Sequence, residues 1–306
     1  MPRLSEFLIW FPAIEPSAAR VTVVASCDEA AAGLRLRGCL EGPTCAYART
    51  VEGETPLVSE PVAEGIKAEA AVQAGAVLME PCLWEPDHPF LYHAELELWQ
   101  GDDRLDERTL SLGVRHLECD SSGFRLNGRR LQLAGAAVDA ATRLDEETLG
   151  GWHGTGSIAL AAERVSEGLL HRADRLGVFL IVALPDDLAA ADGADGARIS
   201  EWRLHPSVAL WTVGREEHVD AVRRLDATRP IALRTNPAGV LQQTAAHLFA
   251  VTGPASEIAG VASRASKPLL VWSEDPALPS ADVFQDVLAE RQKQLAGAPN
   301  VAGIVA

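Results

Sequence analysis

The alternation of hydrophobic and polar positions divides the chain into two parts with different periods. From residue 17 to about residue 120, short segments alternate in polarity or are rich in β-branched residues, and turn sequences such as Glu41-Gly42-Pro43 separate several of them. This pattern predicts an antiparallel β-sandwich. The expected strands include Val21–Ala25, Leu34–Cys39, Lys67–Val72 and Ala94–Trp99. The segment before them, residues 1–12, reads as a first strand or a packing arm, because Glu6 and Pro12 interrupt its apolar run.

After residue 130 the pattern changes to short apolar runs that alternate with amphipathic segments, as in a parallel sheet covered by helices. Eight such units in sequence predict a (β/α)8 TIM barrel, so the expected fold class is α/β with an all-β sandwich in front. We place the sandwich in residues 1–120 and the barrel in residues 121–306. The expected barrel strands are Leu131–Gly135, Ser157–Ala161, Val178–Leu184, Val208–Val213, Ile231–Thr235, His247–Thr252, 267–274 and Val301–Val305. The expected helices include Glu163–Leu176, Glu217–Leu225 and Ser280–Leu295.

Composition and charge narrow the class of protein. The chain has 306 residues, of which 47% are hydrophobic and 23% charged, as in ordinary globular proteins. A formal net charge of −16 argues against nucleic acid or an anionic membrane as a partner. No apolar run approaches the ~20 residues of a membrane span, and the amino terminus is a poor signal peptide. We therefore expect a cytoplasmic protein.

The cysteines also bear on location. All five precede residue 120, and they have irregular spacing without a Cys-x-x-Cys pair. Such usage favours reduced, mostly buried thiols and no zinc site, although a disulfide within the first domain stays open.

Two stretches of the predicted barrel each end on a glutamate. The first reads His205-Pro206-Ser207-Val208-Ala209-Leu210-Trp211-Thr212-Val213-Gly214-Arg215-Glu216, and it resembles the pattern His-Pro-Ser-Val-x-x-Trp-x-x-Gly-Asn-Glu of glycoside hydrolase family 2. The second reads Lys267-Pro268-Leu269-Leu270-Val271-Trp272-Ser273-Glu274, similar to Lys-Pro-x-x-x-Ser-Glu. Each ends on a glutamate at the carboxyl end of a barrel strand, where TIM barrels keep their active sites.

Three further segments extend the resemblance outside those strands. The run 80–92, with Trp84 and Tyr92, is similar to a proline-rich corner of the family's immunoglobulin-like domain. The run 123–135 contains Asn127-Gly128, a strong hairpin signal in its own right, and resembles the family's lead into the barrel. Asp226-Ala227-Thr228-Arg229-Pro230 is close to the family's Asp-x-Thr-Arg-Pro. The resemblance thus covers about residues 80–306 and implies an immunoglobulin-like domain before the barrel.

The resemblance assigns candidate site residues. It implies Glu216 as the general acid/base and Glu274 as the nucleophile of a retaining β-glycosidase, whose carboxyl groups stand ~5–5.5 Å apart. Arg215, Trp211 and Asp275 are the candidate contacts to the substrate. No metal and no cofactor is expected, and the implied ligand is a carbohydrate.

Other positions depart from the family pattern. Arg215 replaces an Asn that contacts the sugar, and Ala136-Ala137-Val138-Asp139 replaces Asn-x-His-Glu after the first strand. The predicted barrel is also shorter than the roughly 250 residues of a typical one, which leaves little chain for loops over the mouth. Two hypotheses therefore stay open: an active retaining glycosidase, or an inactive relative that binds a carbohydrate or a partner or serves a structural role. A homo-oligomer is also left open, and the residues do not identify the sugar, anomer or linkage.

Overall fold

The computed structural model describes residues 1–63, 70–138, 143–153, 156–188, 193–272, 281–295, 298 and 300–305, with the backbone alone for 281–285. Contacts divide the chain into two compact units. The first comprises Met1–Arg115 together with Ser200–Pro206, and the second comprises His116–Ile199 and Ser207–Ala306. No helix among the described residues is long and apolar enough to span a membrane.

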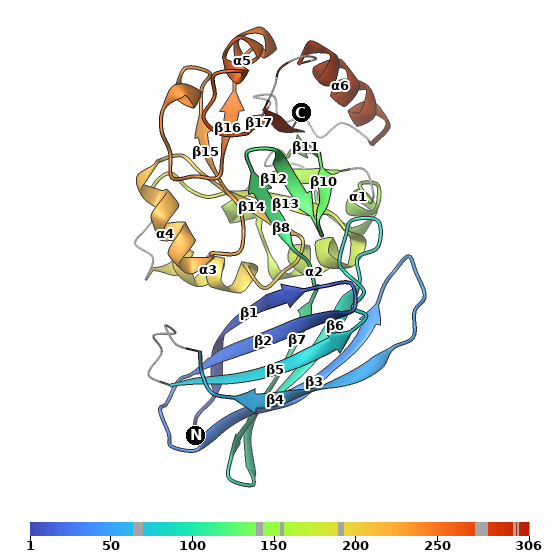
Figure 1. Ribbon diagram of the computed structural model, residues 1–306, viewed down its shortest axis with the longest axis vertical. Coiled ribbons are helices and arrows are strands. Elements are labelled where there is room, and N and C mark those ends of the chain that lie inside the picture. Colours follow the sequence, from blue (N-terminus) through green and yellow to red (C-terminus); the bar gives the residue numbers. More distant parts are fainter. Residues whose placement is uncertain are drawn as a thin grey trace. The chain divides into compact units, whose positions relative to one another are not determined.

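The first unit is an antiparallel sandwich of seven strands in the order β1-β2-β5-β4-β3-β6-β7. Their bounds are β1 Leu4–Ile14, β2 Ala18–Cys27, β3 Leu34–Thr44, β4 Gly53–Glu60, β5 Ala71–Met79, β6 Leu91–Gln100 and β7 Asp103–Leu112 (Figure 1). Alternate residues face the interior: Leu36 and Leu40 of β3 and Leu96 and Leu98 of β6 are all 0% exposed. Burying one such side chain stabilises the fold by about 1.5–3 kcal/mol. The predicted sandwich is confirmed.

The proline-rich corner before β6 is held by its aromatic residues. Trp84 is fully buried and forms a bridge with Pro89, and the guanidinium of Arg115 lies 5.8 Å from the centre of its ring. The Tyr92 hydroxyl accepts a hydrogen bond of 2.9 Å from the backbone N–H of Cys82, and burial raises the pKa of Tyr92 to about 12. The corner therefore has a structural explanation without a ligand.

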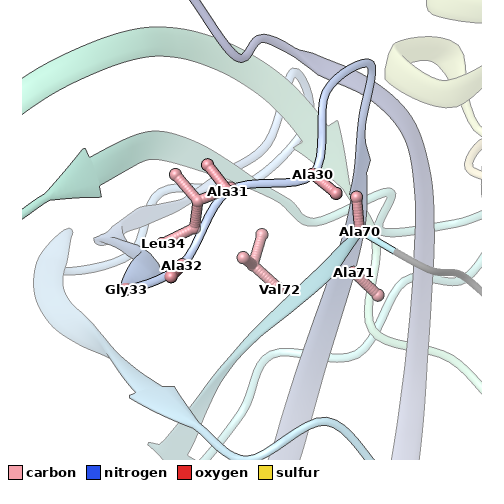
Figure 2. A pocket seen from close by; sticks show the side chains of 8 residues that line it. All are labelled: Ala30, Ala31, Ala32, Gly33, Leu34, Ala70, Ala71 and Val72. Carbon is pink, nitrogen blue, oxygen red and sulfur yellow. The ribbon is translucent and has the colours of Figure 1, made fainter.

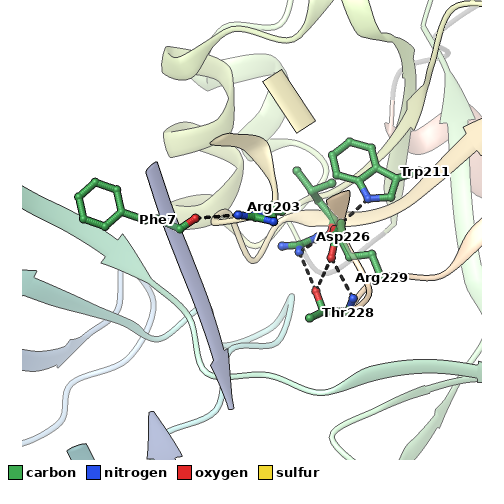
Figure 3. Close-up of polar contacts among 7 residues, drawn as sticks. Phe7, Arg203, Trp211, Asp226, Thr228 and Arg229 are labelled. Atoms are coloured by element: carbon green, nitrogen blue, oxygen red, sulfur yellow. Dashed lines mark hydrogen bonds and ion pairs between the residues drawn. The ribbon is translucent and has the colours of Figure 1, made fainter. Parts of the chain in front are cut away.

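Residues 200–206 belong to the sandwich unit although they lie far along the chain. The Arg203 guanidinium donates a hydrogen bond of 3.0 Å to the backbone carbonyl of Phe7 in β1 (Figure 3). A small hollow of about 300 Å³ opens elsewhere in this unit, where β3 and β5 begin. Its walls carry only alanine, glycine, leucine and valine, from residues 30–34 and 70–72 (Figure 2).

The second unit starts with a three-stranded sheet of β8 Leu117–Asp120, β9 Gly123–Leu126 and β10 Arg129–Leu131. Leu126 pairs with Arg129, so Asn127 and Gly128 form the two-residue turn, with φ of 51° and 78°. Both angles lie in the left-handed region that this turn type requires, which is why Asn-Gly occurs there. The predicted hairpin is confirmed.

Eight parallel strands then close into a barrel in chain order. They are β11 Leu133–Ala137, β12 Ser157–Ala161, β13 Phe179–Ala183, β14 Val208–Val213, β15 Ile231–Thr235, β16 Leu248–Thr252, β17 Leu269–Trp272 and β18 Val301–Val305 (Figure 1). Helices in the connections are α1 Glu146–Gly150, α2 Glu167–Leu176, α3 Ala194–Trp202, α4 Glu217–Leu225, α5 Ala255–Ala262 and α6 Ala281–Gln294. The predicted barrel is confirmed.

One connection has no α-helix. Between β15 and β16 the chain forms only the short 3-10 turn Gly239–Leu241 and otherwise runs without regular structure. The sequence pattern agrees, because residues 236–247 contain Asn236-Pro237 and Gly239, which favour turns over helix. This irregular segment lies against the candidate acid described below.

Several predicted bounds need correction. The first barrel strand is Leu133–Ala137, since residues 129–131 belong to the preceding hairpin. The second helix begins at Glu167, where Ser166 accepts a hydrogen bond from the N–H of Leu169 as its amino-terminal cap. The expected strand Lys67–Val72 lies mostly outside the described residues, and β5 runs from Ala71 to Met79. All five cysteines are free; Cys27 is buried and the other four are half-buried.

Candidate active site at the carboxyl ends of the barrel strands

Strand β14 carries the candidate acid/base to the rim of the barrel. All six of its residues are buried, because a barrel strand packs on both faces. Gly214 follows directly, and a Cβ there would lie 2.0 Å from Oδ1 of Asp186. Only glycine fits at this point while that carboxylate is in place. Glu216 comes two residues later, as the amino-terminal cap residue of α4.

The carboxylate of Glu216 is engaged by the segment between β15 and β16. Its Oε2 accepts a hydrogen bond of 2.6 Å from the Thr244 hydroxyl, and its Oε1 accepts one of 2.7 Å from the N–H of Ala245. The carbonyl of Ala245 accepts a further bond from Arg223, in the last turn of α4. The segment therefore lies along the flank of α4, and it draws the Glu216 carboxylate toward that flank.

Arg215 pairs with a different acid. Its guanidinium lies 3.3 Å from the carboxylate of Glu217, and both side chains are exposed. An exposed ion pair of this kind stabilises a fold by about 0–1 kcal/mol. Arg215 and Glu216 thus share the rim, while the ion pair of Arg215 is with Glu217.

An ion pair that sequence reasoning missed crosses the end of β14. Arg234, on β15, donates to the backbone carbonyl of Leu184 at 2.8 Å and to Oδ1 of Asp186 at 2.5 Å. Both acceptors follow β13, so the pair links β13 to β15 over Gly214. The Asp186 side chain is 69% exposed and that of Arg234 is 32% exposed. This part of the mouth is therefore occupied by opposite charges that solvent reaches.

The indole of Trp211 is held inside the fold. Trp211 is 0% exposed, and its Nε1–H donates a hydrogen bond of 2.9 Å to Oδ2 of Asp226. The same carboxylate oxygen lies 3.1 Å from Arg229, and Oδ1 accepts from the backbone N–H and the hydroxyl of Thr228 at 2.9 and 2.6 Å (Figure 3). Arg229 also donates to the carbonyl of Val208 at 2.8 Å. Trp211 presents no surface to a ligand in this arrangement.

Burial and charge act in opposite directions on Asp226. Burial alone would raise the pKa of its carboxyl group. The guanidinium of Arg229 and the hydrogen bonds from Thr228 and Trp211 outweigh burial and hold the pKa below its usual range. The motif Asp-x-Thr-Arg thus forms a buried structural cluster that ties α4 to β14.

The remaining candidates lie outside the described residues. Glu274 and Asp275 fall within 273–280, directly after β17, and Asp139 falls within 139–142. Of the five candidate residues, the structure therefore places Glu216, Arg215 and Trp211. Sequence reasoning could have flagged Arg234, because a charged residue inside an apolar barrel strand is unusual; its partner Asp186 carries no such signal.

Comparisons with known proteins point to one family. The family model for glycosyl hydrolases family 2 matches residues 45–115. A beta-glucuronidase from Paenibacillus borealis is 24% identical over 197 residues, which cover 49% of this chain and 33% of that protein. A beta-galactosidase from Bacteroides ovatus is 29% identical over 166 residues, which cover 45% of this chain and 19% of that protein. The matches thus span a third or less of these curated relatives.

Solved structures extend the likeness to the whole chain. A glycosyl hydrolase family 2 member from Bacteroides cellulosilyticus superposes with a TM-score of 0.71 and 19% identity, covering 100% of this chain and 44% of that one. A beta-glucuronidase from Bacteroides uniformis gives a TM-score of 0.67 and 15% identity, covering 99% of this chain and 46% of that one. At such identities the likeness establishes the fold.

Proposed function

We propose that the chain, whose residues 45–115 match the family model for glycosyl hydrolases family 2, is a member of that family that binds a carbohydrate at the barrel mouth without hydrolysing it. The ligand class comes from the relatives, which are named as a beta-glucuronidase and a beta-galactosidase. The absence of hydrolysis is inferred from the contacts of Glu216.

The observation that carries the proposal is that both oxygens of Glu216 are already bonded. A general acid must bring its proton within ~2.6–3.2 Å of the leaving oxygen. One oxygen of Glu216 accepts a hydrogen bond from the Thr244 hydroxyl, and the other accepts one from the N–H of Ala245. To reach a sugar over the mouth, the Glu216 side chain would have to break both hydrogen bonds.

The pair of Asp186 and Arg234 supports binding at the same mouth. It offers an exposed carboxylate and a guanidinium side by side, and such groups accept from and donate to sugar hydroxyls. A sugar bound there would contact both members of the ion pair. That arrangement can orient a ligand, while Glu216 holds its carboxylate on Thr244 and Ala245.

Retaining hydrolysis by Glu216 and Glu274 is the second candidate. In its favour, both glutamates follow barrel strands, β14 and β17, at the carboxyl ends where this fold places catalytic groups. It requires the two carboxyl groups to come within ~5–5.5 Å of each other over a sugar.

One set of variants separates the two candidates. Release of the aryl group from a panel of aryl β-glycosides is measured for the wild type, Glu216→Gln, Glu274→Gln and the control Glu217→Gln. Glu217 is the neighbouring exposed acid and lies outside the proposed pair, so its variant matches the change of charge. We expect all four proteins to release no more than buffer does. Release by the wild type and by Glu217→Gln, lost in both other variants, would overturn the proposal and establish hydrolysis.

Binding is tested separately by titration calorimetry with neutral β-linked disaccharides. We expect at least one of them to bind the wild type, and Arg234→Gln to weaken that binding while Arg264→Gln does not. Arg264 is a charge-matched control whose guanidinium bonds to the carbonyl of Gly260. If no disaccharide binds, or if both variants bind like the wild type, the proposed site at the mouth is wrong.

A further inference from the structure

A groove opens in the sandwich unit where β4 changes partners. From Gly42 to Gly38, β3 pairs with β4, and Gly38 lies opposite Leu57. From Val58 onward β4 pairs with β5 instead, while the beginning of β3 continues to pair with β6 alone. The two strands thus separate at this point, which leaves a groove of about 700 Å³. Arg35 and Arg37 of β3 line one side, and residues 57–61 line the other.

The two arginines are positioned by uncharged groups. Arg35 donates a hydrogen bond of 2.8 Å to the backbone carbonyl of Gly101, and the guanidinium of Arg37 lies 5.9 Å from the centre of the Trp99 ring. Within the described part of the chain, neither guanidinium forms an ion pair with a carboxylate. The groove therefore keeps two positive charges on one wall.

The nearest carboxylate on β6 is already bonded to other donors. Glu97 lies directly opposite Arg37 in the strand register, and its pKa is lowered by its hydrogen bonds from Trp99 and Arg104. The Trp99 indole N–H donates to one Glu97 oxygen and Arg104 donates to the other, both at 2.9 Å. Glu97 thus holds Trp99 in place beneath Arg37, each of its oxygens already accepts one hydrogen bond, and its interaction with Arg37 is through charge alone.

The carboxylate on the far wall is occupied in the same way. Arg20 donates to Oε1 of Glu60 at 2.6 Å, and the amide of Gln73 donates to Oε2 at 3.2 Å. Glu60 therefore faces β2 and β5 with both of its oxygens. The groove retains a hydroxyl from Ser59 and the apolar surface of Val58, which is 60% exposed.

We propose that this groove binds an acidic saccharide, with the sugar carboxylate on Arg35 and Arg37 and the apolar face of the ring against Val58. Guanidinium groups recognise carboxylates by paired, charge-assisted hydrogen bonds. A hydroxyl and an aliphatic wall suit a sugar ring, which has polar edges and apolar faces. This second site is independent of the barrel mouth and of the function proposed for it.

An acidic peptide is the competing occupant, and the strand register disfavours it. A peptide that adds to a sheet needs a run of free strand edge. The edge of β3 that faces the groove extends only from Leu34 to Arg37, because pairing with β4 begins at Gly38. The small hollow near the start of β3 has only aliphatic side chains in its walls. It therefore adds no charged group that could bind further residues of an acidic peptide.

The test is a titration of the whole chain with trigalacturonate, with neutral trigalactose and tetraglutamate as comparison ligands. We expect trigalacturonate to bind, its affinity to fall as salt rises, and both comparison ligands to bind at least about tenfold more weakly, as expected when charge-assisted bonds are lost. Arg37→Gln and Arg35→Gln should each weaken trigalacturonate about tenfold. Arg108→Gln, which removes an arginine of β7 paired with Asp106, should change nothing.

Each other outcome overturns the inference. No binding to trigalacturonate, equal binding of trigalactose, tighter binding of tetraglutamate, or the same loss in Arg108→Gln would each do so. A thermal unfolding scan of every variant separates loss of the site from loss of the fold. Arg264→Gln, whose guanidinium bonds to the carbonyl of Gly260 and lies in neither proposed site, should leave trigalacturonate binding unchanged. Neutral disaccharides probe the barrel mouth and trigalacturonate probes this groove, so failure at one site and failure at the other are distinguishable.

Discussion

Replacing Asp226 by asparagine tests how the barrel uses its buried charge cluster. Asp226 is 2% exposed, and its two oxygens accept four hydrogen bonds, from Trp211, Arg229 and Thr228. All four partners are donors. An asparagine in the same position must turn its NH2 group either toward Trp211 and Arg229 or toward Thr228. In both orientations donor faces donor, and the charge of Arg229 loses its counterion.

The magnitude follows from burial. Removing one partner of a buried ion pair costs about 3–5 kcal/mol, since the remaining charge is left uncompensated, and Arg229 has a side chain only 8% exposed. For a unit of this size, 1 kcal/mol shifts the midpoint of thermal unfolding by about 2–4 °C. We therefore expect Asp226→Asn to lower the midpoint of the barrel unit by roughly 6–20 °C.

Differential scanning calorimetry measures this shift, and Asp220→Asn is the matched control. Asp220 lies on α4, pairs with Arg223 and has a side chain that is 69% exposed. Its replacement should therefore lower the free energy of unfolding by less than about 0.5 kcal/mol, which corresponds to a shift of the midpoint of ~2 °C at most. The double variant Asp226→Asn, Arg229→Met should recover part of the loss, because it removes the uncompensated charge. Equal shifts for Asp226→Asn and Asp220→Asn would refute the reasoning.

The pH dependence adds a second check on Asp226. Its pKa in the folded state lies below the ordinary value of 3.8, so the folded protein binds this proton less readily than the unfolded chain does. The stabilisation is therefore fully present above pH ~4 and is lost as the pH falls toward the folded pKa. The difference in stability between the wild type and Asp226→Asn should shrink below pH ~4.

Three further predictions concern other parts of the chain. The N–H of Ile231 donates to Nδ1 of His247 at 3.0 Å and burial lowers the His247 pKa, so stability should fall as the pH drops below the unfolded value of 6.5; His247→Gln should flatten this dependence in urea titrations. A Cβ at Gly38 would lie 1.9 Å from the Glu95 carbonyl oxygen, so Gly38→Ala should destabilise the sandwich by about 1–3 kcal/mol in the same titrations; an unchanged midpoint would contradict this. Burial raises the pKa of Cys119 to about 12, so at pH 8 iodoacetamide should leave Cys119 unmodified in the native protein, while mass spectrometry after denaturation should find five alkylated thiols.

The barrel was predictable because its strands are buried on both faces. Such strands read as nearly continuous apolar runs, as Val208–Val213 and Val301–Val305 do, and both coincide with their predicted bounds. The β4 strand gave no comparable signal. This strand pairs with β3 up to Leu57 and with β5 from Val58, and the Val58 side chain is exposed. The apolar and polar residues of β4 therefore do not alternate as they would in a strand with one buried face.

The geometry of the candidate site was less predictable than the fold. The pattern predicted that Glu216 follows β14, as it does. The direction of its side chain, however, depends on Thr244 and Ala245, which lie 28 and 29 residues away in a segment without periodicity. The contact between Asp186 and Arg234 joins residues 48 positions apart. Local pattern cannot reveal such pairs, because they arise only when the barrel closes and brings strand ends together.

The motifs that carry the family resemblance divide by what they contact. Asp226 and Arg229 tie a helix to a strand inside the fold, and Trp84 fills the core of the sandwich corner. These contacts need no ligand, so they persist whether or not the protein acts on a sugar. Gly214 leaves room for the carboxylate of Asp186, which lies against it. A resemblance that rests on such residues therefore predicts the fold more reliably than the activity.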